Sequence, residues 1–341
     1  IGFISLLTSQ VYPIKYFGLF TAFGIFMAYV LALILLPSSI LIFGSRKYKI
    51  KAVDDKPTYT ILNRITDKLL LNKKTTLIVT IVVIVISVIG LQKVWINSSF
   101  LDKFEPNSEI VLTDAFVNSK FGGTSTLNVI VESDDADAFK QPANLRLVDQ
   151  LQESTEQLPK VGNSFSLTDY IKRMNKVMNA DKEEFYAIPD NNEMVAQYLL
   201  LYEMSGDPEN LVKVVNYDYN KLNLTFQLKG DDSKTINEAI AVIKSFENEF
   251  EKNGLKINYA GSGYKALVFS DLILEGQMGS IFLSLALVFI LLVIMFRSFK
   301  AGLIGSVPII ITSLISFGVM GLGNIALSTT TALISSIAIG I

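Results

Sequence analysis

The sequence predicts a polytopic α-helical membrane protein with an α+β domain of split βαβ type inserted on the extracytoplasmic side. Two features of the chain predict this fold class. Long runs without a charged residue alternate with short loops, and one charged, periodic stretch separates the third predicted membrane helix from the fourth. Half of the 341 residues are hydrophobic and only 18% are charged, against about a quarter in soluble proteins, so much of the chain is expected to lie in lipid.

Charge-free runs locate the membrane helices. Residues 17–43 would form a helix about 40 Å long, which is enough to cross a hydrocarbon layer of about 30 Å. Residues 75–91 are rich in Ile and Val but too long for a typical strand, so they are predicted to form a membrane helix. Residues 278–296 are predicted as the next span.

The remaining apolar segments lie at the two ends of the chain. Residues 301–341 carry no charge, and the cluster of Gly321, Gly323 and Asn324 is expected to divide them into two helices. Residues 1–8 are expected to be the last turns of an earlier span. The final helix is expected to be truncated, because the chain stops within an apolar run.

Basic residues predict the orientation in the membrane. Segment 45–74 holds nine Lys or Arg residues against three Asp, which places it in the cytoplasm by the positive-inside rule, and residues 59–71 could form an amphipathic helix on the inner membrane surface. Counting crossings from there puts residues 95–276 outside. The predicted domains are residues 1–44 (the end of one membrane helix and a complete one), 45–74 (a basic cytoplasmic linker), 75–94 (a membrane helix), 95–276 (the extracytoplasmic domain) and 277–341 (membrane helices).

Periodicity predicts a mixed α+β domain between the third and fourth spans. Apolar residues recur with helical spacing in two segments, and alternate or cluster as in strands in three others. The predicted order is a strand at 127–131, a helix at 144–158, a helical insert at 167–204, a strand at 222–228, a helix at 233–252 and a strand at 255–259. This order suggests a split βαβ sandwich with helices on one face.

The composition excludes several classes of site. Without Cys or His, the chain has no disulfide, no thiol nucleophile, no Ser-His-Asp triad and none of the usual zinc sites. We therefore predict no catalytic residue, no cofactor and no metal, and no enzyme activity. Acidic residues of the soluble region could form a cation site, but their spacing fits no calcium loop and favours a solvated rim: Asp102, Glu105, Glu109, Asp134, Asp135 and Asp137. The net charge of −2 argues against a nucleic-acid partner.

Two features within the predicted spans are candidates for function. Small residues recur at intervals of four on the last helix and predict a close helix interface, either a functional seam or packing alone: Ser328, Ala332, Ser336 and Gly340. Pro308 is a candidate hinge, because proline frees a backbone carbonyl within a helix. The predicted membrane spans contain no Asp, Glu, Lys or Arg, so no proton relay can be placed on them.

Several phrases of the sequence together resemble one protein family. They are IGFISLLTSQVYPIKYFGLFTAFGIFMAYVLALILLPSSIL at residues 1–41, FLDKFEPNSEI at 100–110, KFGGTSTLNVIVE at 120–132, AQYLLLYEMSG at 196–206, MFRSFKAGLIGSVP at 295–308 and TALISSIAIGI at 331–341. In this order they resemble the resistance-nodulation-division (RND) superfamily, in its mycobacterial-membrane-protein-large-like (MMPL-like) branch of bacterial exporters.

The resemblance implies a fold and a function. Members have twelve helices in two repeated halves, and this chain would run from helix five to helix ten, with a porter-like domain between. Many members use the proton gradient to export hydrophobic molecules across the bacterial cytoplasmic (inner) membrane, which implies a lipid or other hydrophobic small-molecule substrate. A homo-oligomer or a periplasmic partner stays open. The relay acid of the tenth helix would follow Ile341.

Two functions therefore remain. The first is a proton-driven exporter of lipids or other hydrophobic molecules. The alternative is a non-transporting sterol-sensing or receptor-like protein, or a protein-translocation accessory, of the same fold, since a fold does not determine a function. A carboxylate soon after Ile341 in the parent protein would favour the first.

Overall fold

The computed structural model describes residues 2–43, 71–95, 97, 99–205, 208–328 and 331. The chain divides into two compact units. One, the helical unit, comprises Ile1–Ile96 and Asp271–Ile341, and the other, the sheet unit, comprises Asn97–Ser270.

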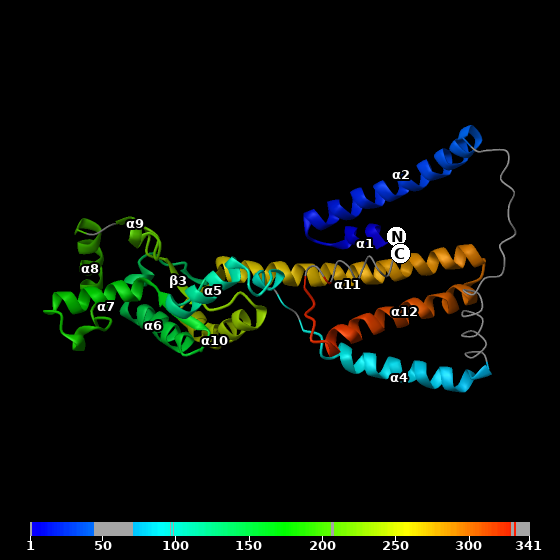
Figure 1. Cartoon of the computed structure of the whole chain (residues 1–341). Helices are drawn as coiled ribbons and strands as arrows, with labels where there is room; N and C mark the ends of the chain where they lie inside the picture. The colour runs from blue at the N-terminus through cyan, green and yellow to red at the C-terminus, as the bar shows by residue number, and fades with distance from the viewer. Residues whose placement is uncertain are drawn as a thin grey trace. The chain divides into compact units, whose positions relative to one another are not determined.

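The helical unit contains most of the apolar sequence. Its elements are α1 (Gly2–Ser5), the 3-10 turn η1 (Leu6–Thr8), α2 (Tyr12–Phe43), α4 (Lys73–Leu91), the greater part of α11 (Gly261–Phe296) and α12 (Phe299–Leu322) (Figure 1). The four long helices α2, α4, α11 and α12 are long and apolar enough to cross a membrane. Each contains a run predicted from the sequence. Residues 45–70, with most of the predicted amphipathic helix, lie outside the described part of the chain.

Two of these helices contain an internal proline. Pro37 lies within α2 and Pro308 within α12, and both helices are continuous through it. Proline removes one backbone donor from a helix and so frees the carbonyl four residues earlier, which for Pro308 is that of Ile304. One turn further on, the Thr312 hydroxyl donates to the Pro308 carbonyl over 2.8 Å. The hinge at Pro308 stays a prediction.

The sheet unit has helices and one antiparallel sheet. Its elements are η2 (Leu101–Lys103), α5 (Glu109–Lys120), β1 (Ser125–Ser133), η3 (Ala138–Lys140), α6 (Pro142–Glu156), β2 (Val161–Phe165), α7 (Leu167–Met178), η4 (Glu183–Phe185), α8 (Asn192–Ser205), α9 (Pro208–Leu211), β3 (Lys221–Leu228), α10 (Ser233–Lys252), β4 (Leu255–Ala260) and the start of α11.

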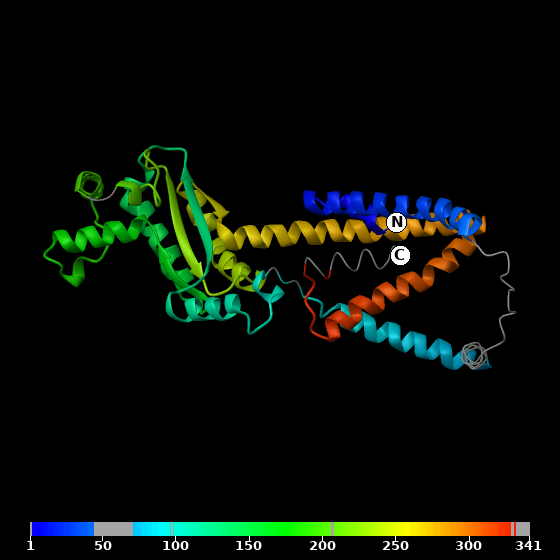
Figure 2. The same cartoon turned by 45° about the horizontal axis from the view of Figure 1, so that its top comes forward.

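The strands have the order β2-β3-β1-β4 (Figure 2). Each neighbouring pair is antiparallel, so β1 is parallel to β2 and β3 is parallel to β4. Helix α6 connects the first parallel pair across β3, and α10 connects the second across β1. Two crossovers that each span one intervening strand are the topology of a split βαβ unit.

The core of the sheet unit lies on one face of the sheet. Alternation along β1 buries Leu127, Val129 and Val131, and the same alternation on β3 buries Leu224 and Phe226. Helices α6 and α10 cover this face (Figure 1). The apolar period-two pattern of the strands and the apolar stripes of the helices therefore meet in one core.

The opposite face of the sheet is polar. Asn128 on β1 donates to Asn223 and to Thr225 on β3, both over 2.9 Å. Such cross-strand pairs stabilise a half-exposed sheet face. These hydrogen bonds also help to fix the register of β1 against β3.

Strand β2 and helix α5 are among the elements of the sheet unit that the sequence does not predict. Strand β2 is short and buries only Val161, so it has no alternating apolar pattern to reveal it. Helix α5 has no buried residue at all. The helical insert is present as α7, η4 and α8. Helix α11 is one helix from Gly261 to Phe296, so it begins well before the predicted span at 278–296.

Candidate functional site

A groove beside α5 in the sheet unit has a volume of about 900 Å³. This volume is within the range of small-molecule sites. We call it the α5 groove. It is lined by Phe100, Leu101, Ser108, Glu109, Ile110, Thr113, Asp114, Val117, Thr124, Ser125, Asp231, Ser262 and Ala266.

The α5 groove has an apolar wall because α5 keeps its apolar side chains at the surface. Of the α5 side chains that line the groove, Ile110 is 44% exposed and Val117 is half-buried. Phe100, on the other side of the groove, is 55% exposed and packs edge-on against Phe104. Contiguous exposed apolar surface of this kind typically marks a binding site.

Carboxylates lie among the apolar residues of the groove. Asp114 accepts hydrogen bonds from the Asn118 amide over 2.6 Å and from the Thr124 hydroxyl over 2.5 Å, both neutral donors. Asp231 accepts the backbone N–H of Phe100 over 2.7 Å, which ties the groove's aromatic wall to the segment before α10. Glu109 lies in the first turn of α5. The groove is thus apolar with an acidic edge.

A turn at the junction of β4 and α11 forms the floor of the groove. Gly261 has φ of 97°, and a methyl group there would come within 2.5 Å of the Thr126 carbonyl oxygen. Only glycine adopts this conformation at low cost and permits so close an approach. The Ser262 hydroxyl then accepts the N–H of Thr126 over 3.0 Å. This turn brings Ser262 and Ala266 into the groove.

A second feature, in the helical unit, is a contact between α4 and α12 that we call the glycine seam. It consists of Ser87 and Gly90 on α4 and Gly318 and Gly321 on α12. A methyl group on Gly318 would lie 2.5 Å from the Ser87 Cα, so the two backbones touch. Both figures show α4 and α12 meeting at this end and separating toward Lys73 and Phe299 (Figures 1 and 2). Small residues permit such close helix packing in lipid.

Hydrogen bonds close the same end of the helix pair. The Trp95 indole N–H donates to the Asn324 side-chain oxygen over 3.0 Å, and the Leu327 N–H donates to the Trp95 carbonyl over 2.8 Å. Asn324 has φ of 52°, a conformation that asparagine tolerates better than most residues. The segments after α4 and α12 are therefore joined as well as the helices.

Polar side chains also join the first residues of the chain to α11. The Ser5 and Ser280 hydroxyl oxygens lie 2.7 Å apart, and both residues are buried. Thr8 donates to the Gly276 carbonyl over 3.4 Å. In an apolar environment such bonds hold helices together, although each contributes only about 1 kcal/mol.

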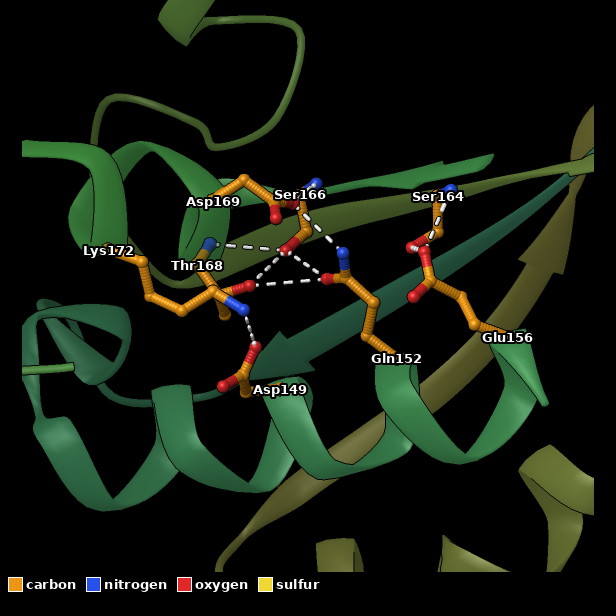
Figure 3. Close-up of polar contacts among 8 residues, drawn as sticks. All are labelled: Asp149, Gln152, Glu156, Ser164, Ser166, Thr168, Asp169 and Lys172. Carbon is orange, nitrogen blue, oxygen red and sulfur yellow. Dashed lines mark hydrogen bonds and ion pairs between the residues drawn. The ribbon is translucent and has the colours of Figure 1, made fainter. Parts of the chain in front are cut away.

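A buried polar network in the sheet unit fastens α7 to α6 (Figure 3). Ser166 caps α7 and Asp169 accepts the Ser166 N–H over 2.9 Å, forming a capping box. Gln152 of α6 accepts from the Ser166 hydroxyl and donates to Asp169. Lys172 donates to Asp149 over 2.6 Å. Because its donors and acceptors pair with one another, we assign the network a structural role.

The charge of Lys172 is stabilised within this network. Burial alone would lower the pKa of Lys172, but the hydrogen bond and charge of Asp149 outweigh it and hold the pKa above its ordinary value.

The described residues contain no group of three or more Asp and Glu arranged to hold a metal ion.

Comparison with known proteins identifies the family. The sequence model of the MMPL family matches residues 109–341, more than half of the chain. The chain belongs to the MMPL family. This is the branch that the phrases of the sequence resemble. As an MMPL protein with several apolar helices it is a multi-pass protein of the lipid bilayer.

One sequence relative and one solved structure show how far the similarity of this MMPL protein extends. It is 21% identical over 271 residues to MJ1562 of Methanocaldococcus jannaschii, which is named only as a membrane protein, and the match covers 78% of this chain and 67% of the relative. The cryo-EM structure of the hedgehog release protein Disp from the water bear Hypsibius dujardini superposes with a TM-score of 0.60 at 11% identity. That match covers 99% of this chain and 46% of Disp, so the MMPL chain spans less than half of that structure.

The candidate residues predicted from the MMPL sequence fall in different places. Pro308 lies inside α12. Ser328 follows α12 and exchanges hydrogen bonds with Thr331: its hydroxyl accepts the Thr331 N–H, and its own N–H donates to the Thr331 hydroxyl. The other three members of the predicted stripe lie outside the described residues: Ala332, Ser336 and Gly340. The stripe as a functional seam stays a prediction.

The stripe predicted from the sequence uses a spacing of four, and the glycine seam does not follow it. Its small residues are separated by three positions on each helix, Ser87 with Gly90 and Gly318 with Gly321. Residues at i and i+3 also share a helix face, so the sequence does contain a signal for the seam. It contains no signal that α4 pairs with α12.

Proposed function

We propose that this chain is part of a proton-driven exporter of lipids or other hydrophobic molecules, and that its sheet unit receives the substrate outside the cytoplasm. The observation that carries the proposal is the α5 groove, an apolar hollow of about 900 Å³. It lies in the unit that separates two pairs of candidate membrane helices along the sequence. Membership of a family of transporters supports it.

The distribution of charge supports the extracytoplasmic placement. Segment 45–74 is strongly basic, and the Arg297–Lys300 loop is basic as well. Both precede a membrane helix and would face the cytoplasm, which leaves the sheet unit on the other side. In this proposal the proton relay is supplied by carboxylates outside the charge-free spans, because these spans carry no Asp or Glu.

Transport by the reconstituted parent protein tests the proposal. We expect a fluorescent lipid analogue to move across proteoliposomes when a proton gradient is imposed and to stop when a protonophore collapses it. Ala266→Phe would place a ring in the α5 groove and should reduce transport about tenfold or more, since one methylene too many in a pocket already costs 1–3 kcal/mol. Ala241→Phe, on the exposed face of α10, is the matched control.

The outcome also distinguishes the alternative. Binding of the lipid analogue without gradient-dependent movement, in protein that remains folded, would contradict export and favour the sterol-sensing or receptor-like function. Equal transport by Ala266→Phe and Ala241→Phe would show that the α5 groove is not on the substrate path.

A further inference from the structure

The charged side chains that line the α5 groove are carboxylates. Its lining includes the carboxylates of Glu109, Asp114 and Asp231, and among the described residues that line it there is no Lys or Arg. The two hydrogen bonds recorded for the Asp114 side chain come from neutral groups, so they do not offset its charge. Negative charge beside an apolar wall attracts cations and repels anions.

An ammonium group of the chain itself already lies at the aromatic wall. The Lys103 Nζ is 5.4 Å from the centroid of the Phe100 ring. This is within the distance of a cation–π interaction, which is typically about 0.5–1 kcal/mol at an exposed site. The Phe100 face is therefore accessible to a cation from outside the groove's lining.

From these observations we propose that the α5 groove binds cationic amphiphiles. The alkyl chain would lie along Phe100, Ile110 and Val117, and the ammonium group would lie toward the carboxylates of Glu109 and Asp114. This inference rests on the proposed function, of which it specifies the substrate class. It predicts that Lys103 competes with the ligand for the Phe100 ring.

Three probes of equal chain length test the charge preference. Dodecyltrimethylammonium, dodecyl sulfate and dodecyl maltoside are titrated by equilibrium dialysis against the parent protein in phosphatidylcholine nanodiscs, with empty nanodiscs subtracted. We expect the cation to bind at least about fivefold more tightly than the other two at low salt, a difference of about 1 kcal/mol. The preference should shrink as ionic strength rises.

Charge variants locate the site. Glu109→Gln and Asp114→Asn should each weaken cation binding about threefold to tenfold and leave dodecyl maltoside binding unchanged. Lys103→Gln should strengthen cation binding, a gain that misfolding cannot produce. Glu193→Gln removes an acidic residue from the first turn of α8, outside the groove, and is the matched control for Glu109.

The possible outcomes separate this inference from the proposed function. Equal binding of the three probes, abolished by Ala266→Phe, would overturn the cationic preference and leave the export proposal standing. A cationic preference that is unchanged in Glu109→Gln, Asp114→Asn and Lys103→Gln would show that the site lies elsewhere, and this result would also overturn the inference. Because binding is measured without a proton gradient, failure of transport alone would not affect it.

Discussion

Gly90 of α4 and Gly318 of α12 approach so closely that a methyl group on Gly90 would lie 2.2 Å from the carbonyl oxygen of Gly318. A methyl group on Gly321 would likewise lie 1.9 Å from the carbonyl oxygen of Gly90. Real contacts do not reach these distances, so any side chain at either position must move the helices apart. The glycine seam therefore depends on the absence of side chains rather than on their packing.

Gly90→Ala should destabilise the helical unit. Alanine is the better helix former, but overpacking at a backbone contact typically costs about 1–3 kcal/mol. Gly24→Ala is the control, since a methyl group on Gly24 of α2 would meet nothing within 4 Å. Thermal unfolding of the purified protein should show a lower midpoint for Gly90→Ala alone. Equal midpoints would mean that the seam is not a stabilising contact.

Lys172→Met should destabilise the sheet unit by about 3 kcal/mol, because it leaves the Asp149 carboxylate partly buried without its cation. The two side chains are only 11% and 19% exposed. Hydrogen exchange of the amides in α6 and α7 measures the effect locally. The double variant Lys172→Met with Asp149→Leu should recover part of the protection. No recovery would indicate that the loss comes from packing and not from the unpaired charge.

The same pair should weaken at high pH. The pKa of Lys172 is raised in the folded protein, so its contribution is present below the unfolded value of about 10.4 and is lost as pH rises through the folded pKa. Exchange protection of Lys172→Met should lack this alkaline decline.

Asp232 should stabilise α10 in a manner that fails in acid. Burial opposes its ionisation, but hydrogen bonds from Thr235 and Lys160 outweigh burial and lower the pKa of Asp232. Its contribution is therefore present above the unfolded value of about 3.9 and is lost as pH falls through the lower folded pKa. Asp232→Ala should cost about 1 kcal/mol at neutral pH, as N-cap losses do. Asp134→Ala, at a mostly exposed ion pair with Lys256, should cost far less in the same denaturation assay.

Cysteine labelling should establish which side of the membrane the sheet unit occupies. The chain has no native Cys, so a single introduced thiol is the only target in it. We expect Asp135→Cys to react with a membrane-impermeant maleimide in intact cells, and Lys51→Cys to react only after lysis. The reverse pattern would invert the proposed topology.

The predicted stripe on the last helix has its own test. Ser336→Leu should reduce transport by the parent protein at matched expression, because a large side chain would separate helices that pack through small residues. Ile337→Leu, on a different face, should have little effect. Full transport by Ser336→Leu would leave only a packing role for the stripe.

The sequence alone determined the membrane helices, because the apolar length that crosses a bilayer is a local property of the chain. It also determined the bounds of β3, α10 and β4 to within a residue. Each of these elements buries one face in the core, so its apolar residues recur with the period of a strand or a helix. The sequence does not predict strand β2 or helix α5. Strand β2 buries one residue and α5 buries none, so neither has a periodic pattern of apolar residues.

Only the tertiary structure decided what lies next to what. The α5 groove joins residues from five separate segments, and no local pattern shows that Asp231 and Ala266 approach α5. The spacing of Ser87 with Gly90 and of Gly318 with Gly321 indicates two faces that can be approached closely, but helix pairing is a choice among several apolar surfaces. That choice depends on the complementary fit of two backbones, and this fit exists only once both helices are packed.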